Sequence, residues 1–125
     1  CSMIDDYNVV LDKKVKALRC LLEESYAEAV RSRLRVLDLE GLKESFEAYI
    51  AKYGAEGRYA EELHCCWFGV AVRRIELFGD ASGDLLVEAQ AAYAAWQEHF
   101  GKTEPRSKWG DRITRAHEKL QHRNE

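Results

Sequence analysis

His64, Cys65 and Cys66 carry the side chains of this chain best suited to metal binding or nucleophilic attack. Imidazole and thiolate are preferred zinc ligands, and a thiolate is a strong nucleophile. Three consecutive residues of a helix, however, point about 100° apart and cannot converge on one ion. The other three histidines repeat no zinc-ligand spacing. We therefore expect no metal here, and a small enzyme or ligand-binding bundle with a site near Cys66 and His64 is the third hypothesis for function.

The carboxylates do not complete a known cofactor motif. Di-metal helical bundles place a histidine three residues after a glutamate on two helices. Glu61 precedes His64 by that distance, but the second motif is missing. The segment 79–84 is rich in glycine and aspartate, yet no lysine follows it and no strand precedes it, so it is no phosphate-binding loop. The sequence predicts no cofactor.

The middle of the chain is acidic. Residues 39–101 contain eleven Asp and Glu against five Lys and Arg. Glu40, Glu44 and Glu47 step by four and three, so we expect them along one edge of a helix. Glu61 and Glu62 follow beyond the next turn. Such a surface can dock a basic partner protein, although an ordinary solvated helix face has the same composition.

The last segment is basic. Residues 102–125 contain seven Lys and Arg against four Asp and Glu. Four cationic residues share one side of the expected final helix, which is a possible phosphate-binding surface: Arg112, Arg115, Lys119 and Arg123. Nucleic-acid binding through this helix is the second hypothesis, and Asp111 and Glu118, which interleave with the cations, weigh against it.

The first 38 residues predict one long helix that ends near Asp38, with a break near residues 24–25 as the alternative. Its apolar residues recur at steps of three and four and are expected to form one buried stripe. That stripe contains Leu11, Val15, Leu18, Leu22, Tyr26, Ala29 and Val30.

Four more helices are expected. Asp38 is suited to cap a second helix that Gly54 ends, and a third over 58–78 is apolar around much of its circumference and therefore central. Gly69 inside it suggests a close neighbour. A fourth helix begins near Asp84 and ends before Gly101, and a fifth follows Pro105. No stretch alternates in the manner of a strand, so the prediction is an all-α, compact bundle of about five helices without a sheet.

The 125 residues and 46% hydrophobic composition predict a single helical domain over 1–125, with 102–108 a linker to the basic C-terminal helix. No apolar run is long enough to cross a bilayer, and the start of the chain, Cys1 to Asp6, lacks the basic and then apolar layout of a signal peptide. We expect no membrane partner, reduced thiols and a cytoplasmic location. Cys1 is interpreted as preceding the natural start, and a lipidated terminus is the alternative.

By elimination, the sequence favours a non-enzymatic protein-binding module that occludes a partner, of the immunity-protein, antitoxin or inhibitor type. The acidic residues would steer a basic protein, and aromatic side chains would anchor it. The expected anchors are Tyr49, Tyr53 and Tyr59. The identity of the partner, the oligomeric state and the presence of a ligand pocket stay open.

Overall fold

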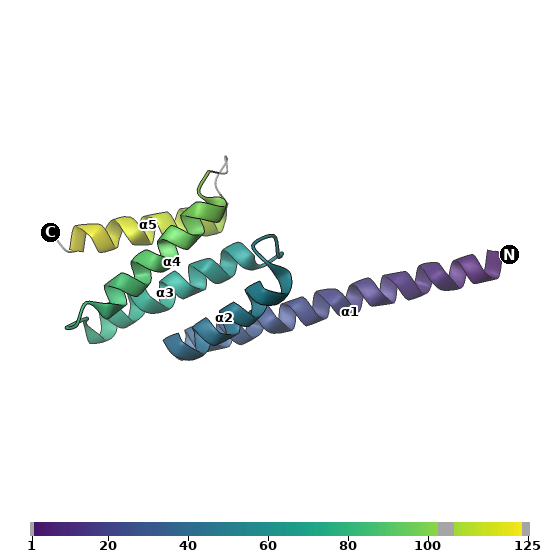
Figure 1. Ribbon diagram of the computed structural model, residues 1–125, viewed down its shortest axis with the longest axis horizontal. Coiled ribbons are helices and arrows are strands. Elements are labelled where there is room, and N and C mark those ends of the chain that lie inside the picture. The colour runs from purple at the N-terminus through teal and green to yellow at the C-terminus, as the bar shows by residue number, and fades with distance from the viewer. Residues whose placement is uncertain (1, 103–106, 124–125) are drawn as a thin grey trace.

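The computed structural model describes residues 2–102 and 107–123, with side chains for residues 10–102 and 107–122. This part of the chain forms five helices and no strand (Figure 1). They are α1 (Ser2–Arg35), α2 (Leu39–Tyr53), α3 (Ala60–Phe78), α4 (Asp84–Phe100) and α5 (Lys108–Arg123). The predicted all-α bundle is confirmed.

Helix α3 is the centre of the bundle and contacts each of the other four helices. One core cluster joins α3 to α1 and α2 and contains Val30, Leu42 and Leu63. A second joins α3 to α4 and α5 and contains Phe68 and Ile113. The central position predicted for the third helix is confirmed, because apolar residues on several sides of α3 give each neighbour a surface to cover.

The ends of α2 follow the expected local signals. The Asp38 side chain accepts a hydrogen bond from the backbone N–H of Gly41 at 3.0 Å. Gly54, with φ of 71°, ends the helix in a conformation that residues with a Cβ rarely adopt. At the start of α4 the capping carboxylate belongs to Asp80, which accepts from the backbone N–H groups of Leu85 and Leu86 at 3.1 and 2.9 Å.

Helix α1 is one long helix, as predicted, but its apolar stripe is not buried along its whole length. Leu11 is 46% exposed, Leu18 65% and Leu22 44%. Tyr26 and Val30 do pack in the bundle. The expectation of a continuous buried stripe is wrong because α2 turns back after Tyr53, so the N-terminal half of α1 projects beyond its neighbours (Figure 1).

Gly69 does not mark a close helix approach. A Cβ at this position would meet only the Leu34 Cδ1 atom, at an ordinary 3.9 Å. The close approach lies instead at Gly57, which packs against the Tyr49 hydroxyl. Any Cβ at Gly57 would displace that hydroxyl.

The predicted linker falls between α4 and α5, and its residues 103–106 lie outside the described part of the chain. Among the described helices, none has both the length and the apolar character that crossing a bilayer requires.

Candidate functional site

The acidic edge, defined as Glu40, Glu44 and Glu47, lies on the outer side of α2. All three residues are exposed, while Leu42 and Phe46 of the same helix point into the core. Within residues 10–102 and 107–122, none of the three has an ion-pair or hydrogen-bond partner. Their negative charge is therefore fully presented to solvent.

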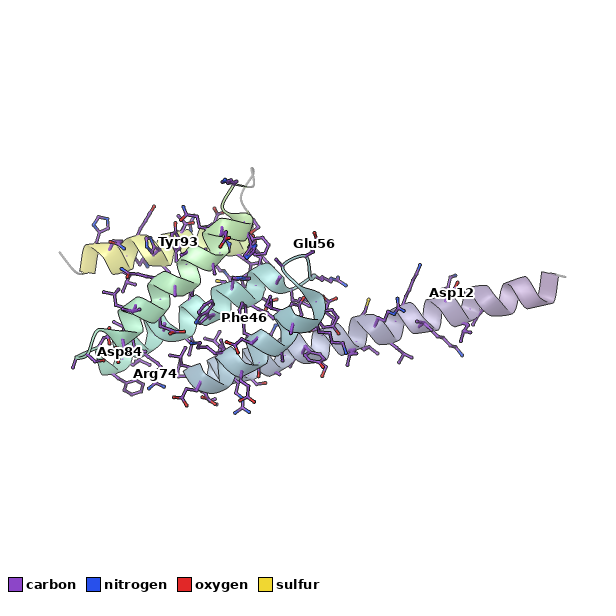
Figure 2. The ribbon with its side chains drawn as sticks, in the orientation of Figure 1. Asp12, Phe46, Glu56, Arg74, Asp84 and Tyr93 are labelled. Carbon is purple, nitrogen blue, oxygen red and sulfur yellow. The ribbon has the colours of Figure 1, made fainter. Side chains whose placement is uncertain are left out.

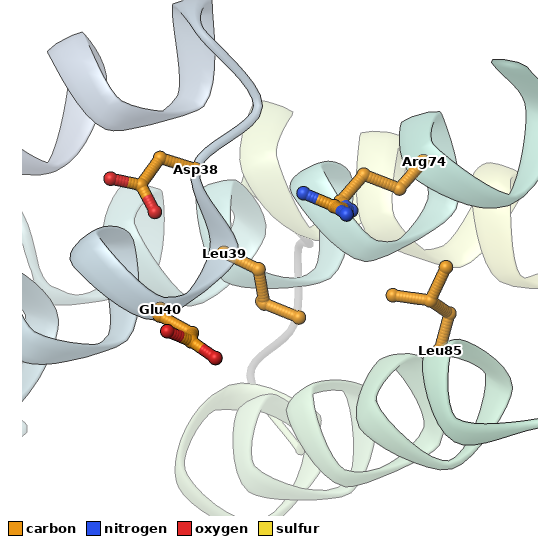
Figure 3. Close-up of a pocket in the computed structure, with 5 residues that line it drawn as sticks. All are labelled: Asp38, Leu39, Glu40, Arg74 and Leu85. Atoms are coloured by element: carbon orange, nitrogen blue, oxygen red, sulfur yellow. The ribbon is translucent and has the colours of Figure 1, made fainter. Parts of the chain in front are cut away.

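A pocket of about 280 Å³ adjoins the first residue of this edge. Asp38, Leu39 and Glu40 line it from the start of α2, Arg74 from α3 and Leu85 from α4 (Figure 3). The guanidinium of Arg74 points toward the start of α2 (Figure 3). One edge of this guanidinium already donates a hydrogen bond to the protein backbone.

That edge of Arg74 has a structural role. Its Nη1 donates to the carbonyl oxygen of Leu37 at 2.9 Å, and Leu37 is the non-glycine residue of the described chain with positive φ, 57°. The Nε atom of Arg74 is buried and has no partner among the described residues. Arg74 thus supports the tight turn between α1 and α2 through its Nη1 atom.

Tyr49, predicted as an anchor for a partner, is buried and is not available to one. Its hydroxyl donates to Glu23 Oε2 at 2.7 Å and accepts from the backbone N–H of Tyr59 at 2.9 Å. Burial raises the pKa of this hydroxyl above its ordinary value. Glu23 also accepts from the backbone N–H of Arg58 at 2.9 Å. The anchor role is therefore corrected: Tyr49 joins α1, α2 and the α2–α3 loop.

The other two predicted anchors are half-buried and lie away from the acidic edge. Tyr53 packs on Tyr26, with ring centroids 5.7 Å apart, and its hydroxyl oxygen is buried without a hydrogen-bond partner in the described chain. The Tyr59 ring lies 5.2 Å from the guanidinium carbon of Arg31 and 5.7 Å from that of Arg58.

Glu62 is committed to a network inside the bundle. Arg31 donates to it twice, from Nε at 2.7 Å and from Nη2 at 2.8 Å. The same guanidinium also pairs with Glu24 at 2.6 Å and with Glu28 at 3.4 Å. Three carboxylates on α1 and α3 thus share one arginine, and Glu62 does not extend the acidic edge.

Glu61 is also separate from the acidic edge. It is half-buried, it accepts from the Ser107 hydroxyl, and burial raises the pKa of its carboxyl. The two glutamates that follow the α2–α3 loop therefore hold α3 to its neighbours, and neither of them belongs to the acidic edge.

The His64–Cys66 region has the properties of core rather than of a nucleophilic centre. His64 Nδ1 donates to the Ala60 carbonyl at 2.7 Å, and burial lowers the pKa of the imidazole. Burial raises the pKa of the Cys65 thiol to about 11 and that of Cys66 to about 12. These shifts oppose thiolate formation. No group of three or more potential metal ligands converges in residues 2–102 and 107–123.

The structure brings three of the four predicted cationic residues of α5 together. Arg112, Arg115 and Lys119 line a groove of about 270 Å³ between α5 and α3, into which Glu76 also projects. The side chain of Arg123 lies outside the described part. We call this surface the basic groove.

Trp109 lies at the start of this helix. The Arg112 guanidinium carbon is 4.9 Å from its ring centroid, and the Lys108 ammonium is 5.0 Å away on the same ring. Both cations thus make cation–π contacts with the indole ring.

Sequence reasoning missed the long-range partners. Glu88 of α4 accepts from Trp67 Nε1 at 2.8 Å and pairs with Lys43 at 3.0 Å, which joins three helices. Only the Glu28–Arg31 spacing signals part of the arginine network in the sequence.

Comparison of the chain with protein-family models, with curated proteins and with solved structures finds no match.

Proposed function

We propose that the chain is a non-enzymatic protein-binding module whose acidic edge docks a basic partner protein and covers its surface. The observation that carries the proposal is the exposure of Glu40, Glu44 and Glu47, none of which forms an ion pair in the described chain. Unpaired carboxylates on a rigid helix keep their full attraction for a cationic surface, because no internal partner has to be displaced.

The shape of the edge favours a macromolecule over a single ion. The three carboxylates follow one side of α2 over two turns, about 10 Å, and do not converge on one point. Ala48 and Ala51 are exposed beside them, and their small side chains permit close approach of a partner. An immunity-protein, antitoxin or inhibitor role fits a module that acts by covering such a partner.

The absence of an activated nucleophile in the described chain supports binding over catalysis. Cys66 and His64 both have pKa values shifted by burial toward their neutral forms. The hypothesis of an enzyme near these two residues gains no support from their geometry.

Site-specific photo-crosslinking in the native host tests the proposal. A photoreactive amino acid at Glu44 should capture one basic protein, and the same label at Glu98, an exposed glutamate of α4, should not. Neutralising Glu40 and Glu47 to Gln in the labelled protein should reduce the yield of that product several-fold at low salt. Equal crosslinking from both positions would contradict the proposal, and so would a crosslinking yield that the two Gln substitutions leave unchanged.

A second candidate function is nucleic-acid binding through the basic groove. It is favoured by the convergence of Arg112, Arg115 and Lys119 on one groove and by the stacking of Arg112 on Trp109. Single-stranded RNA or DNA would place phosphates along the cations and a base near the indole.

Fluorescence anisotropy with labelled oligonucleotides tests this candidate. Affinity should fall steeply as salt rises, and Arg115→Ala should weaken binding and reduce the salt slope by about one. Lys52→Ala removes an exposed cation from α2 and serves as the control. Absence of binding at low salt, or equal loss in both variants, would remove this candidate.

A further inference from the structure

The part of α1 that projects from the bundle carries an exposed apolar stripe, defined as Leu11, Val15, Leu18 and Leu22. The exposed fractions are 46%, 38%, 65% and 44%, respectively. Figure 1 shows this half of α1 extending away from the other helices, and Figure 2 shows Asp12 on it. The stripe spans about 17 Å of helix. An apolar row of this length on one helix face resembles half of a helix–helix interface.

The stripe does not face the bundle. Ala27 and Val30, further along α1, are buried against α2 and α3. At about 100° per residue, their side of α1 lies between a quarter and a third of a turn from the stripe. The stripe therefore stays exposed when the bundle is complete, and it adjoins the bundle at its Leu22 end, where Leu22 lines a pocket with Lys52 and Tyr53 of α2.

The spacing of the stripe is symmetric. Its residues step by four, three and four, so the row reads the same in both directions. A two-fold axis perpendicular to the helix places Leu11 opposite Leu22 of a second copy, and Val15 opposite its Leu18. We propose that a second copy of this chain packs antiparallel on the stripe, through an interface in which each copy presents the same face.

The charges along one edge of the stripe agree with this arrangement. Asp12 and Arg19 lie two turns apart on that edge, both exposed and without an ion pair in the described chain. The same two-fold brings Asp12 of each copy to the same edge as Arg19 of the other, offset by two residues or about 3 Å along the axis, which the long arginine side chain can bridge to give two reciprocal ion pairs. A parallel two-fold instead sets this edge of each copy against the other edge of its partner, so Asp12 and Arg19 do not meet and the two ion pairs are lost.

The opposite edge of the stripe carries two exposed apolar residues, with Lys14 between them. Val10 and Leu21 are 50% and 66% exposed, and the antiparallel two-fold pairs each with the other. Burial of Val10 and Leu21 in such a dimer adds apolar area to the interface.

An anionic membrane surface fits these observations less well. Residues 10–22 carry four Lys and Arg, which a lipid headgroup attracts, but the chain has a net charge of -3 and Glu23 and Glu24 follow directly. A lipid surface also gives no role to the matched positions of Asp12 and Arg19. The observations therefore favour the second copy.

Sedimentation velocity over a range of concentrations tests the self-association. The wild-type chain should approach twice its 14.4 kDa mass. Leu18→Glu should raise the dissociation constant at least about tenfold, because it places a charge in the apolar row. The matched control is Leu77→Glu on α3, where the leucine is 66% exposed, and it should leave self-association unchanged. A helical circular-dichroism spectrum for each variant shows that loss of the dimer is not loss of folding.

A charge swap tests the antiparallel geometry. Asp12→Arg and Arg19→Asp should each weaken self-association several-fold, since each sets like charges opposite one another. An equimolar mixture of the two variants should recover the dimer. In the mixed dimer, each of the two pairs between the chains joins an arginine to an aspartate. A wild-type chain that stays monomeric at every concentration, or a mixture that fails to associate, would overturn the proposal. Binding to phosphatidylglycerol vesicles without self-association would overturn it in favour of a membrane surface.

Discussion

Arg31 and Glu62 form a two-point ion pair that joins α1 to α3, with Nε–Oε2 and Nη2–Oε1 distances of 2.7 and 2.8 Å. The side chains are 22% and 13% exposed. Parallel hydrogen bonds between charged groups in this setting are stronger than those of an exposed pair. The contact lies close to the point where α1 leaves the bundle.

We predict that Glu62→Gln lowers the free energy of unfolding by about 1–3 kcal/mol, because one charged acceptor of the Arg31 guanidinium is lost in a partly buried place. Urea denaturation measures the effect. The control is Arg35→Gln, which breaks the Arg35–Glu28 pair, 62% and 46% exposed, and should cost less than about 1 kcal/mol. Equal losses in the two variants would contradict a special role for the Arg31–Glu62 pair.

Tyr49 and Tyr53 offer a matched test of buried hydroxyl groups. Tyr49→Phe removes the acceptor of the Tyr59 N–H and a donor to Glu23, so we expect a loss of about 1–3 kcal/mol in the free energy of unfolding. Tyr53→Phe removes a buried hydroxyl without a partner in the described residues and should be neutral or stabilising. Chemical denaturation of both variants checks the difference, and the reverse order would show that the hydrogen bonds are wrongly assigned.

His64 should make the fold less stable in mild acid. Burial holds its pKa below the ordinary value of 6.5, so below that pH the unfolded chain binds more protons than the folded one. The contribution is complete above pH 6.5 and is lost as pH falls from there toward the lowered pKa of the folded state. The neighbouring His99 lowers that pKa further, although less than burial does.

Thermal unfolding between pH 7.5 and 5.5 measures this dependence. His64→Phe should show a smaller fall in stability over that range, whereas His117, whose pKa burial also lowers, remains in the variant. A histidine NMR titration should place His64 below 6.5. A value above 6.5 would reverse the sign of the prediction.

The thiols should differ sharply in reactivity. Cys20 is exposed on α1, while Cys66 is buried and its pKa is raised to about 12. In a Cys1→Ser background, a thiol-specific dye at pH 8 should label one cysteine quickly, and the Cys20→Ser variant should lose that phase. Cys65 and Cys66 should react only after denaturant is added. Fast labelling of Cys66 in the folded chain would revive the hypothesis of a site near His64.

The helices could be predicted from the sequence because their signals are local. Asp38 begins α2 by capping a backbone N–H group with its side chain, and Gly54 ends the helix with a positive φ. Both effects act within one turn of the helix. The apolar pattern of α3 likewise indicated a central helix. These features depend on residues a few positions apart.

The predictions that were wrong depended on contacts with other helices. Leu11 and Leu18 have the spacing of a buried stripe, and only the position where α2 ends decides that the bundle leaves them uncovered. Tyr49 was predicted as an exposed anchor although it follows Phe46 by three residues on the buried side of α2. The helical periodicity already indicates that Tyr49 is buried. Its prediction as an anchor rested instead on the frequency of tyrosine at protein interfaces.

The candidate site was predictable in part for the same reason. Glu40, Glu44 and Glu47 share an edge because of helix geometry alone, and they do so in the structure. Glu62 is drawn into the bundle by Arg31, 31 positions away, and no local pattern reveals such a partner. Residues whose role depends on a distant counter-charge need the fold itself.

Helix α1 runs through 34 residues without a glycine or proline, so it has no built-in hinge between the part outside the bundle and the part inside. A continuous backbone of this kind transmits torque. Binding at the outer end of α1 would therefore displace the helix as one rod, and the Arg31–Glu62 ion pair is one place where that displacement would meet α3.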